Sequence, residues 1–440
     1  MAKARLVPVF FDPGRDEDFD RQLDTLKRLL PERADFLEPV ALGKRLPEAD
    51  AVVFPQLLGE AYRSLAAFKA IRLPILIVTS EFGTESMWDW EIIAYLRSEG
   101  VWTVAPYDLE QTRAVCSVLC AARELRGSRF LVFQDNPGEG AQASIFKRFY
   151  WWEKECSRRM KKKFGLSVVK RSFRQLAQEA ERIPDEKARQ LWRQCRVPTR
   201  GIGNQPISSA VKLYAAIKRH LDADPSVLAV GVNCLNESHF CDTTPCLAWS
   251  LLFEQRRLIW GCEADTLSML TMYLLERSLD VPLMMTNLYP FLMGQAALKH
   301  EKIKAFPKVD RDPQDCVLVA HCGYFGLVPK CFASEWKLRA KVLAIVDDNA
   351  IAIDARLPLG DVTLAKLDAT MNRLSVVEGR LEEYAVFPGS DCRNGGVIRV
   401  RDGHALMANL ASHHYVLLAG HEAQRIRFIS QVLGLAVDEV

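Results

Sequence analysis

Apolar and polar residues alternate along the first part of the chain with two different periods. Short apolar runs, typical of buried strands, are separated by segments in which apolar residues recur at helical spacing. The predicted strands are residues 6–11, 51–55, 74–78, 101–104 and 128–133, and the predicted helices are residues 16–30, 61–71, 88–98 and 111–125. Strands that alternate with helices indicate βαβ units and a mostly parallel sheet. We therefore predict that residues 1–127 form an open, doubly wound, flavodoxin-like α/β domain.

The same alternation continues through the middle of the chain and then changes. Strands are predicted at residues 166–169, 227–232 and 281–288, and helices at residues 172–182, 185–195, 205–223, 246–254 and 266–278. From about Lys308 the apolar runs become short and closely spaced, as in a small β-domain. We therefore predict a second doubly wound α/β domain over residues 128–307, followed by a β-rich, barrel-like domain with a C-terminal helix over residues 308–440.

The bulk composition is that of a globular protein with more than one core. A chain of 440 residues is too long for a single core, and its formal net charge of +3 does not predict a polyanionic partner. No window is apolar enough for a membrane span, and residues 1–11 lack the pattern of a signal peptide. The 12 cysteines lie mostly in apolar runs and include no CxxC pair. We therefore expect reduced thiols and a cytoplasmic protein that binds neither membranes nor nucleic acid.

Two stretches resemble sites for nucleic acid or nucleotides in composition only. A basic run at residues 158–163 follows the aromatic residues 149–152. Such a run can bind nucleic acid, but it is more typical of a helix with a solvated charged face and inward-facing aromatics. The loop that contains Gly138 and Gly140 lacks the third glycine of a dinucleotide fingerprint. That loop lies in the second predicted domain, and residues 1–127 contain no complete phosphate-binding loop either. A nucleotide-binding first domain is therefore the least favoured hypothesis.

Candidate chemistry is concentrated where acids and histidines meet the ends of predicted elements. Glu263 and Asp265 lie at the start of a helix, where free N–H groups and the helix dipole favour carboxylates. Asn287 lies near the end of an apolar strand, and His321 directly follows another. Two adjacent histidines, His413 and His414, precede a further apolar run. Oxygen and imidazole ligands together suit Mn²⁺, Fe²⁺ or Co²⁺, although each residue could instead only cap a helix, turn a loop or pack in a core.

Five motifs, in this order, resemble the L-fucose isomerase / L-arabinose isomerase superfamily, and most closely its L-fucose-isomerase-like branch. They are TPCLAWSLL (244–252), GCEAD (261–265), LTMYLL (270–275), LVAHCG (318–323) and HHY (413–415). The family consists of metal-dependent aldose–ketose isomerases that usually use Mn²⁺. The resemblance therefore implies two α/β domains before a β-rich one, a small carbohydrate substrate, and a homo-oligomer, either a trimer or a hexamer.

The resemblance also implies roles for individual residues. Glu263 matches the family glutamate that binds the metal and moves a proton, and Asn287 stands at the position of the second acidic ligand. His321 and His414 match metal-binding histidines, and His413 matches a substrate-binding neighbour. Further candidates for substrate binding are His239 and Asp242, in a polar loop after a strand, and Tyr289, beside Asn287.

The amide at Asn287 departs from the family pattern. Its oxygen can bind a hard metal ion, but it cannot accept and return a proton at neutral pH. Glu263 would then work alone, or Asp265 or a bound water would take the place of the missing acid. Two hypotheses follow. The first is an isomerase-like enzyme that acts through an enediolate, with Glu263, Asn287 and Asp265 at its catalytic centre; the second is a sugar-binding or regulatory relative that has lost the acid pair.

Overall fold

The chain divides into two compact units. The computed structural model describes residues 3–11, 14–56, 58–59, 61–135, 148–195, 197–199, 201–234, 240–290, 312–321, 330–340, 349–385 and 395–439. Unit 1 comprises residues 1–124, 277–279 and 425–436, and unit 2 comprises residues 125–276, 280–424 and 437–440. The division into three domains, at residues 1–127, 128–307 and 308–440, stays a prediction.

Unit 1 contains a parallel sheet with the strand order β2-β1-β4-β5-β6, in which β3 also pairs with β1. Helix α1 illustrates how the sequence builds its elements. The side chain of Asp16 caps the helix by accepting a hydrogen bond from the amide of Phe19 at 2.8 Å, and Phe19, Leu23 and Leu26 form its buried face. The elements are β1 (Ala4–Phe10), α1 (Glu17–Leu29), β2 (Ala34–Phe36), β3 (Val40–Ala41), β4 (Ala51–Phe54), α2 (Leu65–Ala70), β5 (Ile75–Ile77), α3 (Met87–Ser98), β6 (Thr103–Val104) and α4 (Leu109–Leu125).

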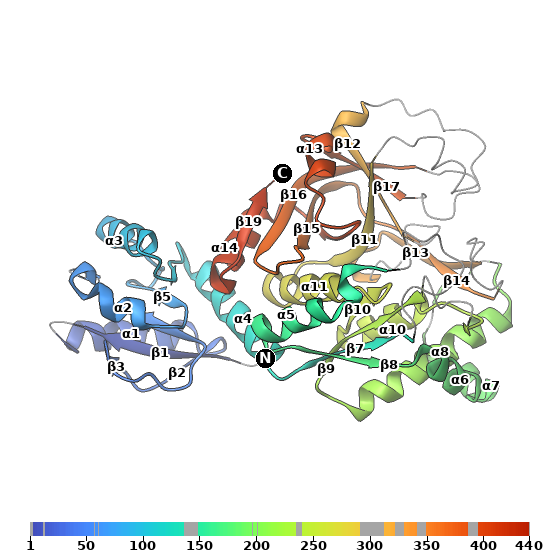
Figure 1. Cartoon of the computed structure of the whole chain (residues 1–440), viewed down its shortest axis with the longest axis horizontal. Helices are drawn as coiled ribbons and strands as arrows, with labels where there is room; N and C mark the ends of the chain where they lie inside the picture. Colours follow the sequence, from blue (N-terminus) through green and yellow to red (C-terminus); the bar gives the residue numbers. More distant parts are fainter. Residues whose placement is uncertain are drawn as a thin grey trace. The chain divides into compact units, whose positions relative to one another are not determined.

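Unit 2 begins with a second parallel sheet, whose strand order is β10-β9-β7-β8 (Figure 1). Its elements are β7 (Arg129–Phe133), the 3₁₀ turn η3 (Tyr150–Trp152), α5 (Lys154–Phe164), β8 (Ser167–Arg171), α6 (Phe173–Glu181), α7 (Asp185–Cys195), α8 (Asn204–Ala223), β9 (Val227–Val232), α10 (Cys246–Arg256), β10 (Ile259–Cys262) and α11 (Thr266–Leu279). The fold is therefore mixed α/β with two parallel sheets, as predicted. The doubly wound arrangement of the helices remains a prediction.

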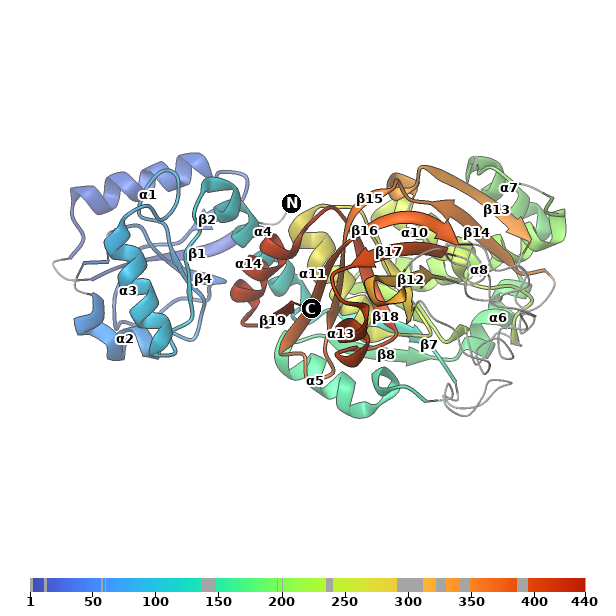
Figure 2. The same ribbon diagram turned by 90° about the horizontal axis from the view of Figure 1, so that it is seen from above.

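Unit 2 also contains a closed antiparallel barrel, whose strands are grouped together in Figure 2, and a separate two-stranded sheet of β13 and β14. Its strand order is β15-β18-β11-β12-β17-β16, and pairing of β15 with β16 closes the ring. This confirms the predicted β-rich, barrel-like region. The elements after α11 are β11 (Leu283–Pro290), β12 (Cys316–Ala320), β13 (Glu335–Ala340), β14 (Ile351–Arg356), β15 (Gly360–Leu367), β16 (Arg373–Ala385), β17 (Gly395–Val400), α13 (Gly403–Ala408), β18 (His414–Ala419), α14 (Ala423–Leu433) and β19 (Ala436–Glu439). Most of α14 belongs to unit 1, which includes residues 425–436.

The short apolar runs at residues 341–347 and 350–354, separated by a turn at Asp348 and Asn349, predict a hairpin, and the described residues include only its second strand. The strand at 350–354 is present as β14, but it pairs antiparallel with β13, which the apolar pattern did not reveal. The expected partner at 341–347 lies outside the described residues. β13 is only partly buried and alternates with charged residues, so it lacks the apolar run that identified the other strands. None of the helices that the structure describes is long and apolar enough to span a bilayer.

Two of the buried cysteines provide a test of the packing. Burial raises the pKa of both Cys116 in α4 and Cys156 in α5 to about 12. Because the thiolate is the reactive form, neither should react with iodoacetamide at pH 8 in the native protein. Mass spectrometry should find both modified only after unfolding in urea. Complete labelling of either thiol in the folded protein would show that its helix does not pack as described.

Candidate metal centre

The backbone at Glu263 adopts a conformation that non-glycine residues rarely take. Glu263 and Ala264, between β10 and α11, have φ angles of 52° and 53°. Two indoles support this turn, since Nε1 of Trp151 and Nε1 of Trp152 donate hydrogen bonds to the carbonyl of Glu263 at 3.2 and 2.7 Å. Strained backbone of this kind concentrates at functional sites, where the surrounding structure holds it in place.

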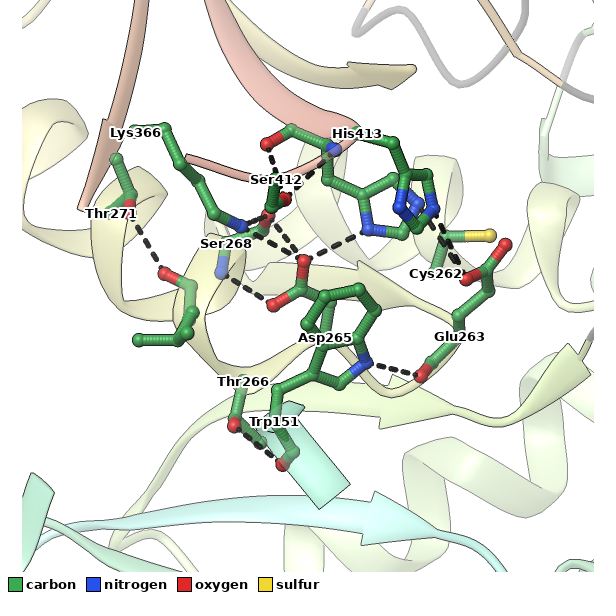
Figure 3. A network of polar contacts seen from close by, with 12 residues as sticks. Trp151, Cys262, Glu263, Asp265, Thr266, Ser268, Thr271, Lys366, Ser412 and His413 are labelled. Atoms are coloured by element: carbon green, nitrogen blue, oxygen red, sulfur yellow. Dashed lines mark hydrogen bonds and ion pairs between the residues drawn. The ribbon is translucent and has the colours of Figure 1, made fainter. Parts of the chain in front are cut away.

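The side chain of Glu263 lies next to two histidines of the barrel (Figure 3). Oε2 of Glu263 is 3.5 Å from Nε2 of His413 and 3.8 Å from Nε2 of His414. Each of the three residues offers one ligand atom, and these atoms all lie within 4.8 Å of one another. Glu263 and His414 are buried, whereas His413 is half-buried. The cluster could therefore hold a metal ion that is reached past His413.

Asp265 caps α11 and also anchors the site (Figure 3). Its Oδ1 accepts a hydrogen bond from the amide of Ser268 at 2.9 Å. Its Oδ2 accepts from the hydroxyl of Ser268 at 2.8 Å and from Nζ of Lys366 at 2.9 Å. The third partner of Oδ2 is Nδ1 of His414, at 2.9 Å. Asp265, Lys366 and His414 are all fully buried, so this network is closed to water.

This network determines which nitrogen of His414 is available to a ligand. An ionised carboxylate only accepts hydrogen bonds, so Nδ1 of His414 carries the proton and Nε2 keeps its lone pair. Burial lowers the pKa of His414 to about 4, assisted by His413 and opposed by Glu263 and Asp265. The ring is therefore neutral at pH 7. A neutral imidazole whose second nitrogen is held by a carboxylate is the usual form of a metal-binding histidine.

The charge on Asp265 is maintained by its neighbours. Burial acts to raise the pKa of Asp265, but Lys366 and His414 outweigh it and lower this pKa well below its usual range. Burial also lowers the pKa of Lys366, and Asp265 opposes that effect. Lys366 therefore keeps Asp265 ionised, and the carboxylate of Asp265 in turn orients the ring of His414 through Nδ1, the nitrogen that does not face the cluster. The predicted catalytic role of Asp265 remains a prediction, since these contacts occupy both of its oxygens.

Asn287 lies beside His414 because the two residues are directly paired between β11 and β18. Paired residues of neighbouring strands project to the same face of a sheet. Nδ2 of Asn287 donates a hydrogen bond to the hydroxyl of Tyr289 at 2.9 Å, which fixes the orientation of the amide. Its Oδ1 is buried and has no hydrogen-bond partner among the described residues. Tyr289 thus orients the amide of Asn287. That Tyr289 also contacts the substrate stays a prediction.

The remaining predicted residues lie apart from the cluster or outside the described part of the chain. His321 follows β12, is buried, and packs its ring edge-on against Trp260, with centroids 6.3 Å apart. It does not belong to the group of three ligand atoms. Asp242 accepts a hydrogen bond from the hydroxyl of Ser209 at 2.5 Å. His239 lies outside the described residues. Ligand roles for these three residues stay predictions.

Sequence reasoning missed Lys366, Trp151 and Trp152. The two tryptophans pack inward before α5, as the aromatic run predicts, but nothing in the sequence pairs them with Glu263. Lys366 had a detectable signal, because a lysine near the end of an apolar strand needs a buried anion as its partner.

Comparison with models of known protein families and with curated proteins finds no match for this chain. The proposed function therefore depends on the arrangement of the described residues.

Proposed function

We propose that this protein is a metal-dependent, isomerase-like enzyme that acts on a small sugar or sugar derivative, with Mn²⁺ as the preferred ion. One observation carries the proposal. Oε2 of Glu263, Nε2 of His414 and Oδ1 of Asn287 are buried and lack a hydrogen-bond partner among the described residues. Both ring nitrogens of His321 share this property. These four residues are the ligands that the resemblance to the L-fucose and L-arabinose isomerases implies.

The donor set fits a divalent cation on chemical grounds. Leaving buried acceptors without partners costs free energy, about 1–3 kcal/mol for each group, and a cation would remove that cost. The carboxylate of Glu263, the imidazole of His414 and the amide oxygen of Asn287 form a mixed nitrogen and oxygen set, which suits Mn²⁺, Fe²⁺ or Co²⁺. The ligand role of His321 stays a prediction, since His321 lies outside the group at Glu263. Asn287 in place of an acid lowers the negative charge of the set, so the affinity should be weaker than that of a site with two carboxylates.

The residues of this chain suggest how a proton could move during aldose–ketose conversion. A bound divalent ion would stabilise the negative charge of an enediolate. Glu263 is the acid and base, because its carboxylate is the only one that the described residues place at the cluster without full hydrogen bonding. His413 is half-buried with Nε2 directed at Glu263, so it can bind a substrate hydroxyl and keep it near the carboxylate.

The Asn287→Asp variant tests the metal site directly. A second carboxylate beside His414 adds a negative charge to the ligand set, so the variant should bind Mn²⁺ about tenfold more tightly or better. Isothermal titration of metal-free protein with Mn²⁺ measures this, and metal analysis of the purified wild type by mass spectrometry gives the natural ion. Asn409→Asp, at the end of α13, is the matched control and should leave the affinity unchanged. If neither the wild type nor Asn287→Asp bound any divalent ion, the metal centre would be refuted.

The second candidate function is a sugar-binding or regulatory protein without turnover. Asn287 favours it, because an amide cannot exchange a proton at neutral pH. The two functions are separated by calorimetry with monosaccharides in the presence and absence of Mn²⁺, followed by assay of ketose formation. Binding that is unaffected by metal and is not followed by isomerisation would support the binding protein.

A further inference from the structure

A row of polar residues continues from the metal centre across the second parallel sheet. The backbone ladder extends one residue past the strand ends, since the amide of Asn233 donates to the carbonyl of Phe133 at 3.0 Å. The amide of Ala264 likewise donates to the carbonyl of Val232 at 3.0 Å. With the register of β7, β9 and β10, this places Gln134, Asn233 and Glu263 side by side at the carboxyl ends of the three strands. We call these three residues the carboxyl-end row.

The members of the carboxyl-end row occupy the same face of the sheet. Phe130, four residues before Gln134, packs against Tyr273 of α11, whereas Phe133 packs against His220 of α8. Side chains alternate along a strand, so Gln134 is on the α11 face. A side chain at Gly231 or Gly261 would collide with Met269 of α11, and the residues two positions further on, Asn233 and Glu263, lie beside the same helix. Asn233 does so by strand alternation. Glu263 follows β10 with a φ of 52° and is placed there by its closeness to His414, which contacts Asp265 at the start of α11.

Gln134 is the informative member of this row. Its side chain is 5% exposed, yet neither its amide nitrogen nor its amide oxygen has a hydrogen-bond partner in the part of the chain that the structure describes. A buried amide without partners is unfavourable, and proteins keep one only where something else supplies the hydrogen bonds. An aliphatic residue would fill the same space without that cost. The Nε2 donor and the Oε1 acceptor of Gln134 are therefore available to a ligand.

We propose that Gln134 forms a hydroxyl-binding subsite that extends the metal centre along the carboxyl-end row. An amide offers both a donor and an acceptor, which matches a hydroxyl group that both donates and accepts. The row contains amides and a carboxylate but no cation, so it does not suit a phosphate or carboxylate group. Neighbouring strands lie about 4.8 Å apart, which separates the strands of Gln134 and Glu263 by roughly 10 Å. The ligand is thus an elongated polyhydroxylated molecule.

This inference rests on the proposed function in one respect, because it assumes that the reacting end of the ligand lies at Glu263. Gln134 would then bind a hydroxyl at the far end of the same molecule. It is a specificity residue rather than a catalytic one, because it lies two strands away from the cluster at Glu263. Sugars with a long hydroxylated chain should bind better than short ones, since only they reach both ends of the row.

The experiment uses full-length protein and alditols, which cannot isomerise and therefore report binding alone. Ribitol, arabinitol, galactitol and mannitol are titrated into the wild type, Gln134→Leu and Gln175→Leu, the last at an exposed position in α6. We expect at least one alditol to bind the wild type, and its affinity to fall about tenfold or more in Gln134→Leu only. Mn²⁺ affinity should stay within about twofold in both variants.

The stability of the ligand-free protein provides a second, independent readout. If the amide of Gln134 has no partner within the fold, Gln134→Leu should melt at the same temperature as the wild type or higher. A lower melting temperature would show that the amide serves the fold and would overturn the subsite. Equal alditol affinity in the wild type and Gln134→Leu, or no alditol binding to the wild type, would overturn it as well. Loss of the metal centre would instead appear as absent Mn²⁺ binding, which is measured separately.

Discussion

Glu263→Ala is expected to lower the affinity of the protein for Mn²⁺ by about two to three orders of magnitude. The carboxylate is the only negative ligand in the group formed with His413 and His414 among the described residues. Breaking a buried charge pair costs about 3–5 kcal/mol, and about 1.4 kcal/mol corresponds to a factor of ten. Titration calorimetry on metal-free protein measures the change. Any isomerase activity should disappear at the same time.

The stability of Glu263→Ala distinguishes a ligand from a structural acid. Oε2 of Glu263 lacks a hydrogen-bond partner among the residues described. Burial acts to raise the pKa of Glu263, but Nε2 of His413 and Nε2 of His414, which lie 3.5 and 3.8 Å from Oε2, outweigh it and lower this pKa. Removal of the carboxylate should therefore cost the metal-free protein only a small part of its stability. Glu181→Ala, at an exposed position in α6, is the matched control and should change neither property. Unchanged metal affinity in Glu263→Ala, or a large loss of stability without metal, would contradict the assignment.

Lys366→Met should destabilise the fold by about 3–5 kcal/mol, because it leaves the buried carboxylate of Asp265 without its cation. Methionine retains much of the apolar stem of lysine, so the loss reports the charge rather than the packing. Urea unfolding at pH 7 measures it. The double variant Lys366→Met with Asp265→Asn should recover much of the stability, since it removes both charges. A single variant as stable as the wild type would show that the pair does not hold this part of the fold together.

The ion pair between Lys366 and Asp265 also predicts how the loss of stability in Lys366→Met depends on pH. Lys366 and His414 hold the pKa of Asp265 below its usual range, against the opposing effect of burial. In the wild type, the stability from this carboxylate is therefore present above about pH 4 and lost as the pH falls below that value. Without Lys366, burial prevails and raises the pKa of Asp265, so the carboxyl takes up a proton more readily. The difference in unfolding free energy between Lys366→Met and wild type should therefore shrink as the pH is lowered from 7 towards 5.

Local patterns in the sequence predicted most of the helices and strands, because each depends on neighbouring residues. The helix 16–30 is observed at Glu17–Leu29, and the strand 227–232 at Val227–Val232. β13 was missed because its half-buried, charged sequence has no apolar run. The barrel was predicted as a class, but its closure between β15 and β16 depends on pairings between distant segments. Such pairings leave no periodic trace in a single sequence.

Part of the candidate site was predictable from the sequence, whereas the residues that hold it in place were not. Glu263, His413 and His414 were identified through motifs, with His413 predicted to bind substrate and not metal, and the structure brings the three together. Lys366 and the two tryptophans act on these ligands through contacts that only the folded chain creates. The position of Asp265 at the start of α11 was evident from the helix pattern. Its contact with His414 was not, because two elements from different parts of unit 2 must meet to form it.

The long sequence separations within the site bear on the order in which the chain folds. Asp265 is 149 residues from His414 and 101 residues from Lys366, and Glu263 is 112 residues from Trp151. Contacts between such distant residues form late, because a long loop must close before they are made. An intermediate with formed helices but an open barrel would lack both histidines beside Glu263. Uptake of Mn²⁺ during refolding would therefore follow barrel closure, and its rate would time the last step of assembly.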